Sequence, residues 1–169
     1  WPIGNRYIFL FFSHTTGSQY LLGDYNKEEH CFYPTFHGRF NFMSFLPGGV
    51  HAPSATSDGE GGVIVIHNMH TGKKSPGWRG ITTLPRKLTL DKCDTINIQP
   101  YGDYKSLRTH HQHIDKTHLP ANKEIIIDNI QGNALEIKAE INIKSSPMIE
   151  MNVLRSPDKE EFTSIKFFK

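Results

Sequence analysis

Acidic side chains are the first candidates for chemistry in this sequence, because carboxylates serve as general acids, bases and nucleophiles. The first of them is Asp24, and Glu28 and Glu29 follow it in a polar, turn-like stretch. Asp58 and Glu60 lie in a second such stretch, DGEGG, where Asp and Gly are favoured for their backbone conformations. These surroundings indicate solvated turn residues rather than a catalytic pair.

A group of histidines offers a second kind of chemistry, because imidazole is a common ligand for zinc or nickel. The group consists of His110, His111, His113 and His118. Its spacing matches no structural zinc motif, and Asp115 is the one carboxylate beside it. A solvated linker is therefore favoured over a metal site. The glycine-rich stretch 59–62 lacks the Lys-Ser/Thr of a phosphate-binding loop, so no cofactor is predicted.

Composition narrows the classes of partner. Hydrophobic residues make up 37% of the chain and aromatic residues 11%, which is enough for globular cores. The net charge of +2 gives no reason to expect nucleic acid or an anionic membrane as a partner. No stretch approaches the ~20 apolar residues that cross a bilayer. The sequence leaves the oligomeric state open.

Two cysteines, Cys31 and Cys93, are too few for a disulfide framework and have no metal-ligand spacing. One bridge between them and two free, buried thiols are both compatible with the sequence. The second interpretation is favoured, and neither identifies a cellular compartment.

The first hundred residues read as short strands separated by turns. Tyr7–Ser13 is hydrophobic, a polar turn follows at Thr16–Gly17, and Gln19–Gly23 returns, which predicts a hairpin. Val63–His67 is β-branched and follows the DGEGG turn, which predicts a second hairpin. Evenly spaced short strands of this kind are typical of propellers and sandwiches. We therefore predict an all-β fold.

The composition changes after residue 98. Residues 99–122 are polar, rich in histidine and bounded by prolines, which indicates a linker with a short helical turn near Tyr104–Arg108. Glu124–Ile130 is then predicted to be a strand. From Leu135 to Ile143, apolar residues alternate strictly with polar ones, which predicts a strand with one buried face and its charges outward. Thr163–Phe168 continues this β pattern.

Four regions, the last of them made of two segments, resemble in the same order glycoside hydrolase family 32, the β-fructosidases that include invertases, levanases and inulinases. The sequence GWRGITTLPRKLTL at 77–90 resembles the family's GWxGxxxLPRxLxL segment. FFSHTTGSQYLLGDY at 11–25 resembles its strand pair hisHnxGxQYYlGdY. QPYGDYKSLR at 99–108 resembles its linker. Segments 132–140 and 153–158 resemble the first strands of its C-terminal sandwich.

This resemblance implies that residues 1–98 form the late blades of a five-bladed β-propeller and that residues 123–169 begin a β-sandwich. It also implies a retaining glycosidase that acts on fructosyl bonds of sucrose, levan or inulin, without a cofactor. The family's three catalytic segments, WMNDPNG, RDP and EC, are absent from this sequence. The resemblance therefore implies a partial chain that is inactive alone, with no catalytic residue of its own. A polysaccharide substrate would favour an extracellular or periplasmic location.

Three residues are predicted to contact a fructose-containing substrate: Gln19, Tyr20 and Trp78. A glutamine exchanges hydrogen bonds with neighbouring hydroxyls, and an aromatic ring can lie against a sugar face. For each of these residues, packing within the blades is the competing interpretation. No residue is predicted to bind a metal ion.

Other positions depart from the family pattern. Ser54 stands where the family has a glutamate, and Ile66 and Asn68 stand where it has tryptophans, so the stacking surface for a sugar is reduced. These departures favour an alternative, a truncated or degenerate member that acts as a non-catalytic carbohydrate-binding or structural module. Arg39, in the segment HGRFNF, is interpreted as a residue that stabilises a turn rather than one that binds a ligand.

Overall fold

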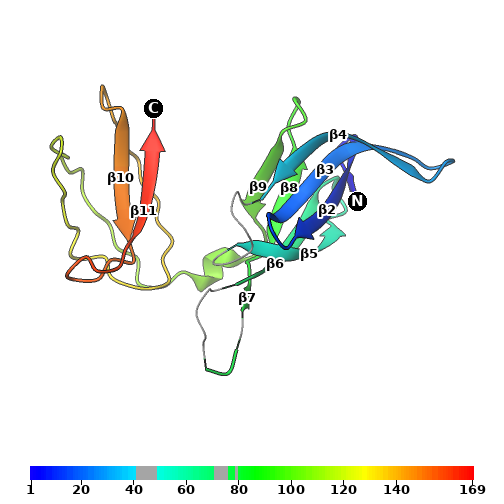
Figure 1. Ribbon diagram of the computed structural model, residues 1–169. Helices are drawn as coiled ribbons and strands as arrows, with labels where there is room; N and C mark the ends of the chain where they lie inside the picture. Colours follow the sequence, from blue (N-terminus) through cyan, green and yellow to red (C-terminus); the bar gives the residue numbers. More distant parts are fainter. Residues whose placement is uncertain (41–48, 71–75, 79) are drawn as a thin grey trace. The chain divides into compact units, whose positions relative to one another are not determined.

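A computed structural model describes residues 1–40, 49–70, 76–78 and 80–169 of the chain (Figure 1). The chain divides into two compact units, Trp1–Tyr104 and Lys105–Lys169. The division falls inside the stretch 99–122 that the sequence marks as a linker. Assignment of the two units to a propeller and a sandwich remains a prediction.

The first unit contains two antiparallel sheets. One has the order β1-β2-β3-β4, and the other has the order β5-β6-β8-β9 with β7 paired to β6. The strands of the first sheet are β1 (Pro2–Ile3), β2 (Arg6–Ser13), β3 (Gly17–Asn26) and β4 (Cys31–Arg39). Those of the second are β5 (Val50–Ser57), β6 (Val63–Met69), β7 (Ile81–Thr82), β8 (Arg86–Leu90) and β9 (Ile96–Pro100). The predicted all-β fold is confirmed, and so are both predicted hairpins.

The core of the first unit lies between these two sheets. Its fully buried members come from both of them: Ile3, Ile8, Leu22, Val63, Val65 and Leu88. Burial of each such side chain stabilises the fold by about 1.5–3 kcal/mol. The core therefore fixes how β2 and β3 lie relative to β6 and β8.

The turn that joins β5 to β6 is held by one carboxylate. Asp58 Oδ1 accepts hydrogen bonds from the backbone N–H groups of Glu60, at 2.7 Å, and Gly62, at 2.8 Å. Its Oδ2 lies 2.7 Å from Lys87 Nζ on the neighbouring strand β8. The ammonium of Lys87 and these backbone donors lower the pKa of Asp58 to about 2. The sequence-based interpretation of Asp58 as a structural turn residue agrees with this geometry.

We expect Asp58→Asn to lower the melting temperature at neutral pH, because asparagine keeps the turn acceptor but loses the charge that pairs with Lys87. Glu60→Gln is the matched control, since Glu60 also contacts Lys87, at 3.1 Å, but its side chain is largely exposed. Asp58 has a depressed pKa, so its contribution is complete above the unfolded pKa of 3.8 and disappears as pH falls towards 2. Melting temperatures of wild type and both variants, measured from neutral pH down to about pH 2, check this pH dependence. A pH-independent difference between wild type and Asp58→Asn would be inconsistent with it.

A 3₁₀ turn, Tyr104–Leu107, spans the division between the two units, and the second unit contains one antiparallel strand pair. The strands are β10 (Met148–Val153) and β11 (Thr163–Phe168), so the predicted strand at 163–168 is confirmed. Ion pairs support the rest of the unit: Arg108 binds Glu136, and Glu124 binds Lys159 and Arg155. No helix in the described part of the chain is both long and apolar enough to span a membrane.

Two sequence predictions for the second unit are wrong. Neither Glu124–Ile130 nor Leu135–Ile143 forms a strand, and the apolar side chains of Leu135, Ile137 and Ile141 are 41–44% exposed. An alternating segment becomes a half-buried strand only if a neighbouring strand takes its backbone hydrogen bonds and a second layer covers its apolar face. Among the described residues of this unit, only β10 and β11 pair, so this segment has neither partner.

The cysteine prediction is half right. Both thiols are free, but both are exposed rather than buried. Cys31 begins β4 beside the β3–β4 turn, and Cys93 lies in the turn between β8 and β9. Cysteine usually behaves as a small buried hydrophobe. Here the turn positions decide its exposure.

Candidate functional site

Gln19 is buried in β3 and has its side-chain amide fully engaged. Its Nε2 donates to Thr16 Oγ1 at 2.6 Å, and its Oε1 lies 2.6 Å from His37 Nε2 on β4. The ring of His37 in turn stacks on Phe11, with centroids 6.0 Å apart. Gln19 therefore ties the turn after β2 to β4.

Tyr20 points to the opposite face of the same sheet, because successive side chains of a strand alternate. Its ring lies over Gly38 of β4, between Phe36 and Phe40, whose centroids are 6.1 and 5.1 Å away. A Cβ at position 38 would lie 2.2 Å from Tyr20 Cζ, so only glycine leaves room for the ring. Burial raises the pKa of the Tyr20 hydroxyl.

Trp78 lies in the segment between β6 and β7 and is 47% exposed. It lines neither of the two pockets described below. The structure therefore does not bring the three predicted contact residues, Gln19, Tyr20 and Trp78, into one pocket. Their roles in substrate binding remain predictions.

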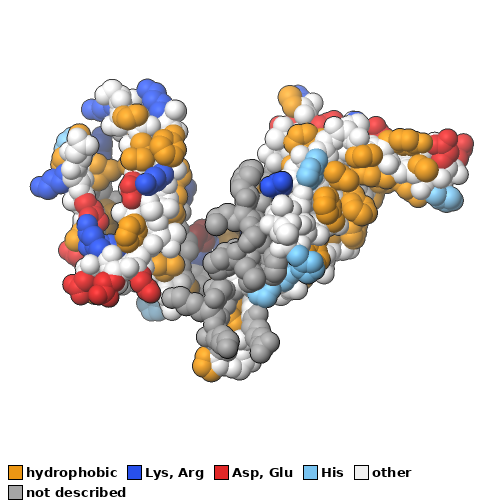
Figure 2. All heavy atoms as spheres, viewed as in Figure 1, with side chains coloured by type: hydrophobic (Ala, Val, Ile, Leu, Met, Phe, Trp, Pro, Cys, Tyr) orange, Lys and Arg blue, Asp and Glu red, His pale blue; other side chains and the backbone are white. Residues whose placement is uncertain are grey.

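The first pocket, here called the histidine pocket, has a volume of about 320 Å³. It is lined by His51, Asn68, Met69, His70 and residues 80–82. The rings of His51 and His70 stack with centroids 4.6 Å apart and planes 13° from parallel. Histidine side chains lie beside hydrophobic ones on the surface of the first unit (Figure 2).

Phe12, at the end of β2, connects this pocket to the first sheet. Its ring lies 5.9 Å from His51 and 5.2 Å from His14. Burial lowers the pKa of His51, and the nearby imidazoles of His70 and His14 lower it further, although a backbone hydrogen bond at Gly49 opposes them. The lowered pKa favours the neutral imidazole of His51, which both donates and accepts hydrogen bonds.

His67 is buried and precedes Asn68, a residue of the pocket lining, on β6. It shares a face of β6 with Val63 and Val65, and its ring lies 5.0 Å from that of Phe40. Neither ring nitrogen has a hydrogen-bond partner in the described part of the chain. Burial, followed by the charges of Arg86 and His51, lowers the pKa of His67 to about 4.

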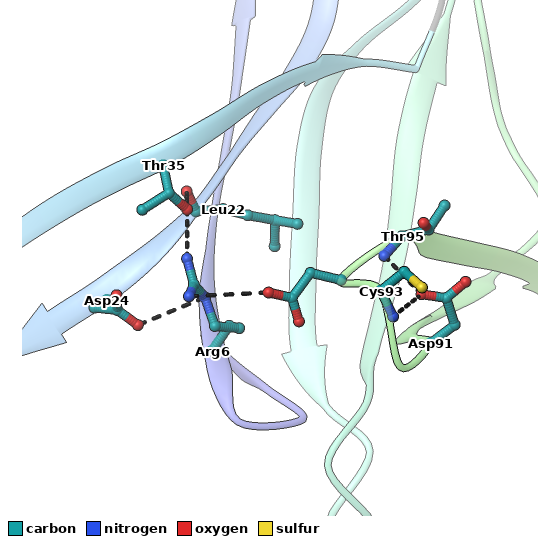
Figure 3. Close-up of polar contacts among 8 residues, drawn as sticks. Arg6, Leu22, Asp24, Thr35, Asp91, Cys93 and Thr95 are labelled. Atoms are coloured by element: carbon teal, nitrogen blue, oxygen red, sulfur yellow. Dashed lines mark hydrogen bonds and ion pairs between the residues drawn. The ribbon is translucent and has the colours of Figure 1, made fainter.

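The second pocket, here called the arginine pocket, has a volume of about 240 Å³ and lies between the first sheet and the β8–β9 turn. Arg6 is at its centre and reaches Asp24 at 3.5 Å, Asp94 at 3.9 Å and the Thr35 hydroxyl (Figure 3). The turn itself is held by Asp91, whose Oδ1 accepts the N–H groups of Cys93 and Thr95 (Figure 3). The described residues that line the pocket are Arg6, Tyr20, Leu22, Thr35, Phe36 and residues 93–96.

Neither pocket has the groups that glycoside hydrolysis requires. A retaining mechanism needs two carboxyl groups about 5–5.5 Å apart, one of them a nucleophile. Within the described residues, no carboxylate lines the histidine pocket, and Asp94 is the single one that lines the arginine pocket. No cluster of three metal-ligating side chains occurs in the described ranges. The four histidines at 110–118 are exposed, and His113 lies 3.6 Å from Asp115.

Sequence reasoning missed both pockets because distant segments build them. His14, His51 and His70 come from three different parts of the chain, and only the packing of the two sheets brings them together. In the family pattern Asn68 stands in place of a tryptophan, yet in the structure it lines the histidine pocket. Phe42, in the segment that contains Arg39, lies outside the described residues.

Comparison with solved structures gives a fold-level likeness. The chain is similar to a family 32 glycoside hydrolase, a β-fructofuranosidase from Bombyx mori solved as a mutant in complex with sucrose. The TM-score is 0.50 and the sequence identity 23%, over 67% of this chain and 27% of the Bombyx mori chain. No family model matches the sequence, and no curated protein does. The fold is therefore all-β and of the kind found in this glycosidase, of which it spans about a quarter.

Proposed function

We propose that this chain is part of a retaining glycoside hydrolase that acts on fructosyl bonds of sucrose, levan or inulin. The observation that carries the proposal is the fold-level likeness to a β-fructofuranosidase that was solved with sucrose. Four motifs in family order support it independently, because they were found in the sequence alone. The chain would contribute to the wall around the substrate rather than the catalytic carboxylates.

The histidine pocket suits such a wall. Its polar groups are the imidazoles of His51 and His70, the amide of Asn68 and the hydroxyl of Thr82. Each of these exchanges hydrogen bonds with hydroxyl groups and carries no negative charge. The apolar side chains of Met69 and Ile81 beside them add apolar surface for the carbon atoms of a sugar.

The second candidate function is a non-catalytic carbohydrate-binding module. Ser54, Ile66 and Asn68 favour it, since they replace a carboxylate and two stacking rings of the family. The nucleotide sequence upstream of the Trp1 codon discriminates between the two. An open frame that encodes segments like WMNDPNG and EC supports the enzyme, whereas a start codon immediately before Trp1 supports the binding module.

The purified 169-residue chain is expected to release no fructose from sucrose or levan, because its described pockets lack a pair of carboxylates. The measurement is an enzymatic assay of free fructose with an active invertase as positive control. A preparation that carries Asp94→Asn and Asp24→Asn together serves as a background control. Release by the wild-type chain that those substitutions abolish would contradict the prediction.

A further inference from the structure

Among the described residues, the arginine pocket shares no lining residue with the histidine pocket. It lies at the junction of β2, β3 and β4 with the β8–β9 turn, on the face of the first sheet that carries Tyr20 rather than Gln19. The ion pair of Arg6 with Asp94 joins the first sheet to the β8–β9 turn, and the ion pair of Arg6 with Asp24 joins β2 to β3. The pocket is therefore a structured cavity in which polar side chains are already oriented.

Its electrostatics disfavour a charged ligand of either sign. The Arg6 side chain is 19% exposed, and its positive charge faces the carboxylates of Asp24 and Asp94. An anion in the pocket would meet the carboxylate of Asp94, and a cation would meet the guanidinium of Arg6. A neutral ligand avoids both costs and still finds charged hydrogen-bond partners, which are the stronger kind.

The other lining groups are those that recognise hydroxyl-bearing rings. The Asp94 carboxylate accepts hydrogen bonds from hydroxyl groups, and the Tyr20 hydroxyl both donates and accepts. The Thr35 hydroxyl already donates to the Leu22 carbonyl and accepts from Arg6. Burial alone raises the pKa of Tyr20, and within the described residues no hydrogen bond occupies its hydroxyl. The rings of Tyr20 and Phe36 provide an apolar surface for carbon-bound hydrogens.

We propose that the arginine pocket binds one neutral, polyhydroxylated ring of monosaccharide size. Its volume of about 240 Å³ lies below the ~300–1,000 Å³ of pockets for drug-sized ligands, which limits the occupant to a single sugar unit. The inference rests on this cavity and its side chains, and it stands whether or not the chain belongs to a fructosidase.

Cys93 makes the proposal directly measurable, because its exposed thiol lines the pocket. A bound sugar should shield it from alkylation by iodoacetamide. Cys31 is an internal control, since it is also free and exposed but does not line the pocket. Peptide mass spectrometry gives both alkylation rates in one sample of the intact chain. We expect D-fructose or D-glucose to slow Cys93 about tenfold at about ten times its Kd, with Cys31 unchanged.

Two variants test the assigned contacts. Tyr20→Phe removes one hydroxyl and keeps the ring, and Asp94→Asn removes one charge and suits a position whose φ is 58°. Each is expected to raise the sugar concentration for half protection by about three- to tenfold. Tyr25→Phe is the matched control, because Tyr25 lies on the same strand but packs on Tyr7, with centroids 5.5 Å apart, outside the pocket. It should leave protection unchanged.

Three outcomes would overturn the proposal. The first is that neither sugar protects Cys93 from alkylation, and the second is that alkylation of both cysteines is slowed equally. The third is that inorganic phosphate protects Cys93 where the sugars do not. The last result would identify an anion site. An unchanged circular dichroism spectrum and melting temperature in Tyr20→Phe and Asp94→Asn show that the variants keep the fold, so a loss of protection then reports on the pocket itself.

Discussion

Lowering the pH from about 7 to about 4 is expected to reduce the free energy of unfolding by about 3 kcal/mol through His67. The pKa of this imidazole falls from 6.5 to about 4 in the folded chain. A difference of about 2.5 in the pKa between the unfolded and folded chain corresponds to about 3 kcal/mol in the free energy of unfolding. The unfolded chain binds the proton first, so stability is complete above 6.5 and declines as pH falls towards 4. His51, whose pKa is also lowered, adds a contribution of the same sign.

Urea unfolding at several pH values, followed by circular dichroism, measures this effect. His67→Leu replaces the imidazole with an apolar side chain in the same core and should remove most of the decline between pH 6.5 and 4. His118→Leu is the matched control, because that histidine is exposed in the second unit. A decline that persists unchanged in His67→Leu would show that another group is responsible.

Leu88→Ala is expected to destabilise the first unit by about 2–5 kcal/mol, the usual cost of a large-to-small substitution in a core. Leu88 is fully buried, pairs directly with Val63 across β8 and β6, and packs with Ile8 and Leu22 of the other sheet. Its loss would leave a cavity where the two sheets meet. Such a cost is a large part of the ~5–15 kcal/mol that stabilises a typical domain.

Leu84→Ala provides the comparison, because Leu84 is 55% exposed in the segment just before β8. The same chemical change there should cost within ~0.5 kcal/mol. Denaturant midpoints of the two variants give the difference. Equal midpoints would mean that the interface between the two sheets is not the core of this unit.

Local patterns were enough to predict much of the first unit. The DGEGG turn and the β-branched run after it predict the β5–β6 hairpin, because glycine conformations, the Asp58 side chain and strand propensity all act within a few residues. The β2–β3 hairpin is predicted in the same way, from the polar turn at Thr16–Gly17 between two strand-forming segments. Even the structural role of Asp58 could be read from its turn context.

Properties that depend on distant partners could not be predicted from these patterns. Leu135–Ile143 alternates as a strand should, but alternation describes one face and does not supply the neighbour that a strand needs. Gln19 and Tyr20 are both predicted to contact the substrate, although alternation along β3 places their side chains on opposite faces of the sheet. Cys93 and Asp94 line a pocket only because the β8–β9 turn meets β2 and β4 in three dimensions.

The most direct test of the proposed function is fructose release from sucrose, levan and inulin by the protein made from the complete gene, compared with the 169-residue chain. The proposed glycosidase predicts release by the complete protein and none by the chain of 169 residues. It also predicts that His51→Ala with His70→Ala in the complete protein raises KM, since both line the proposed saccharide wall. A complete protein that releases no fructose from any of the three substrates would contradict the proposed function.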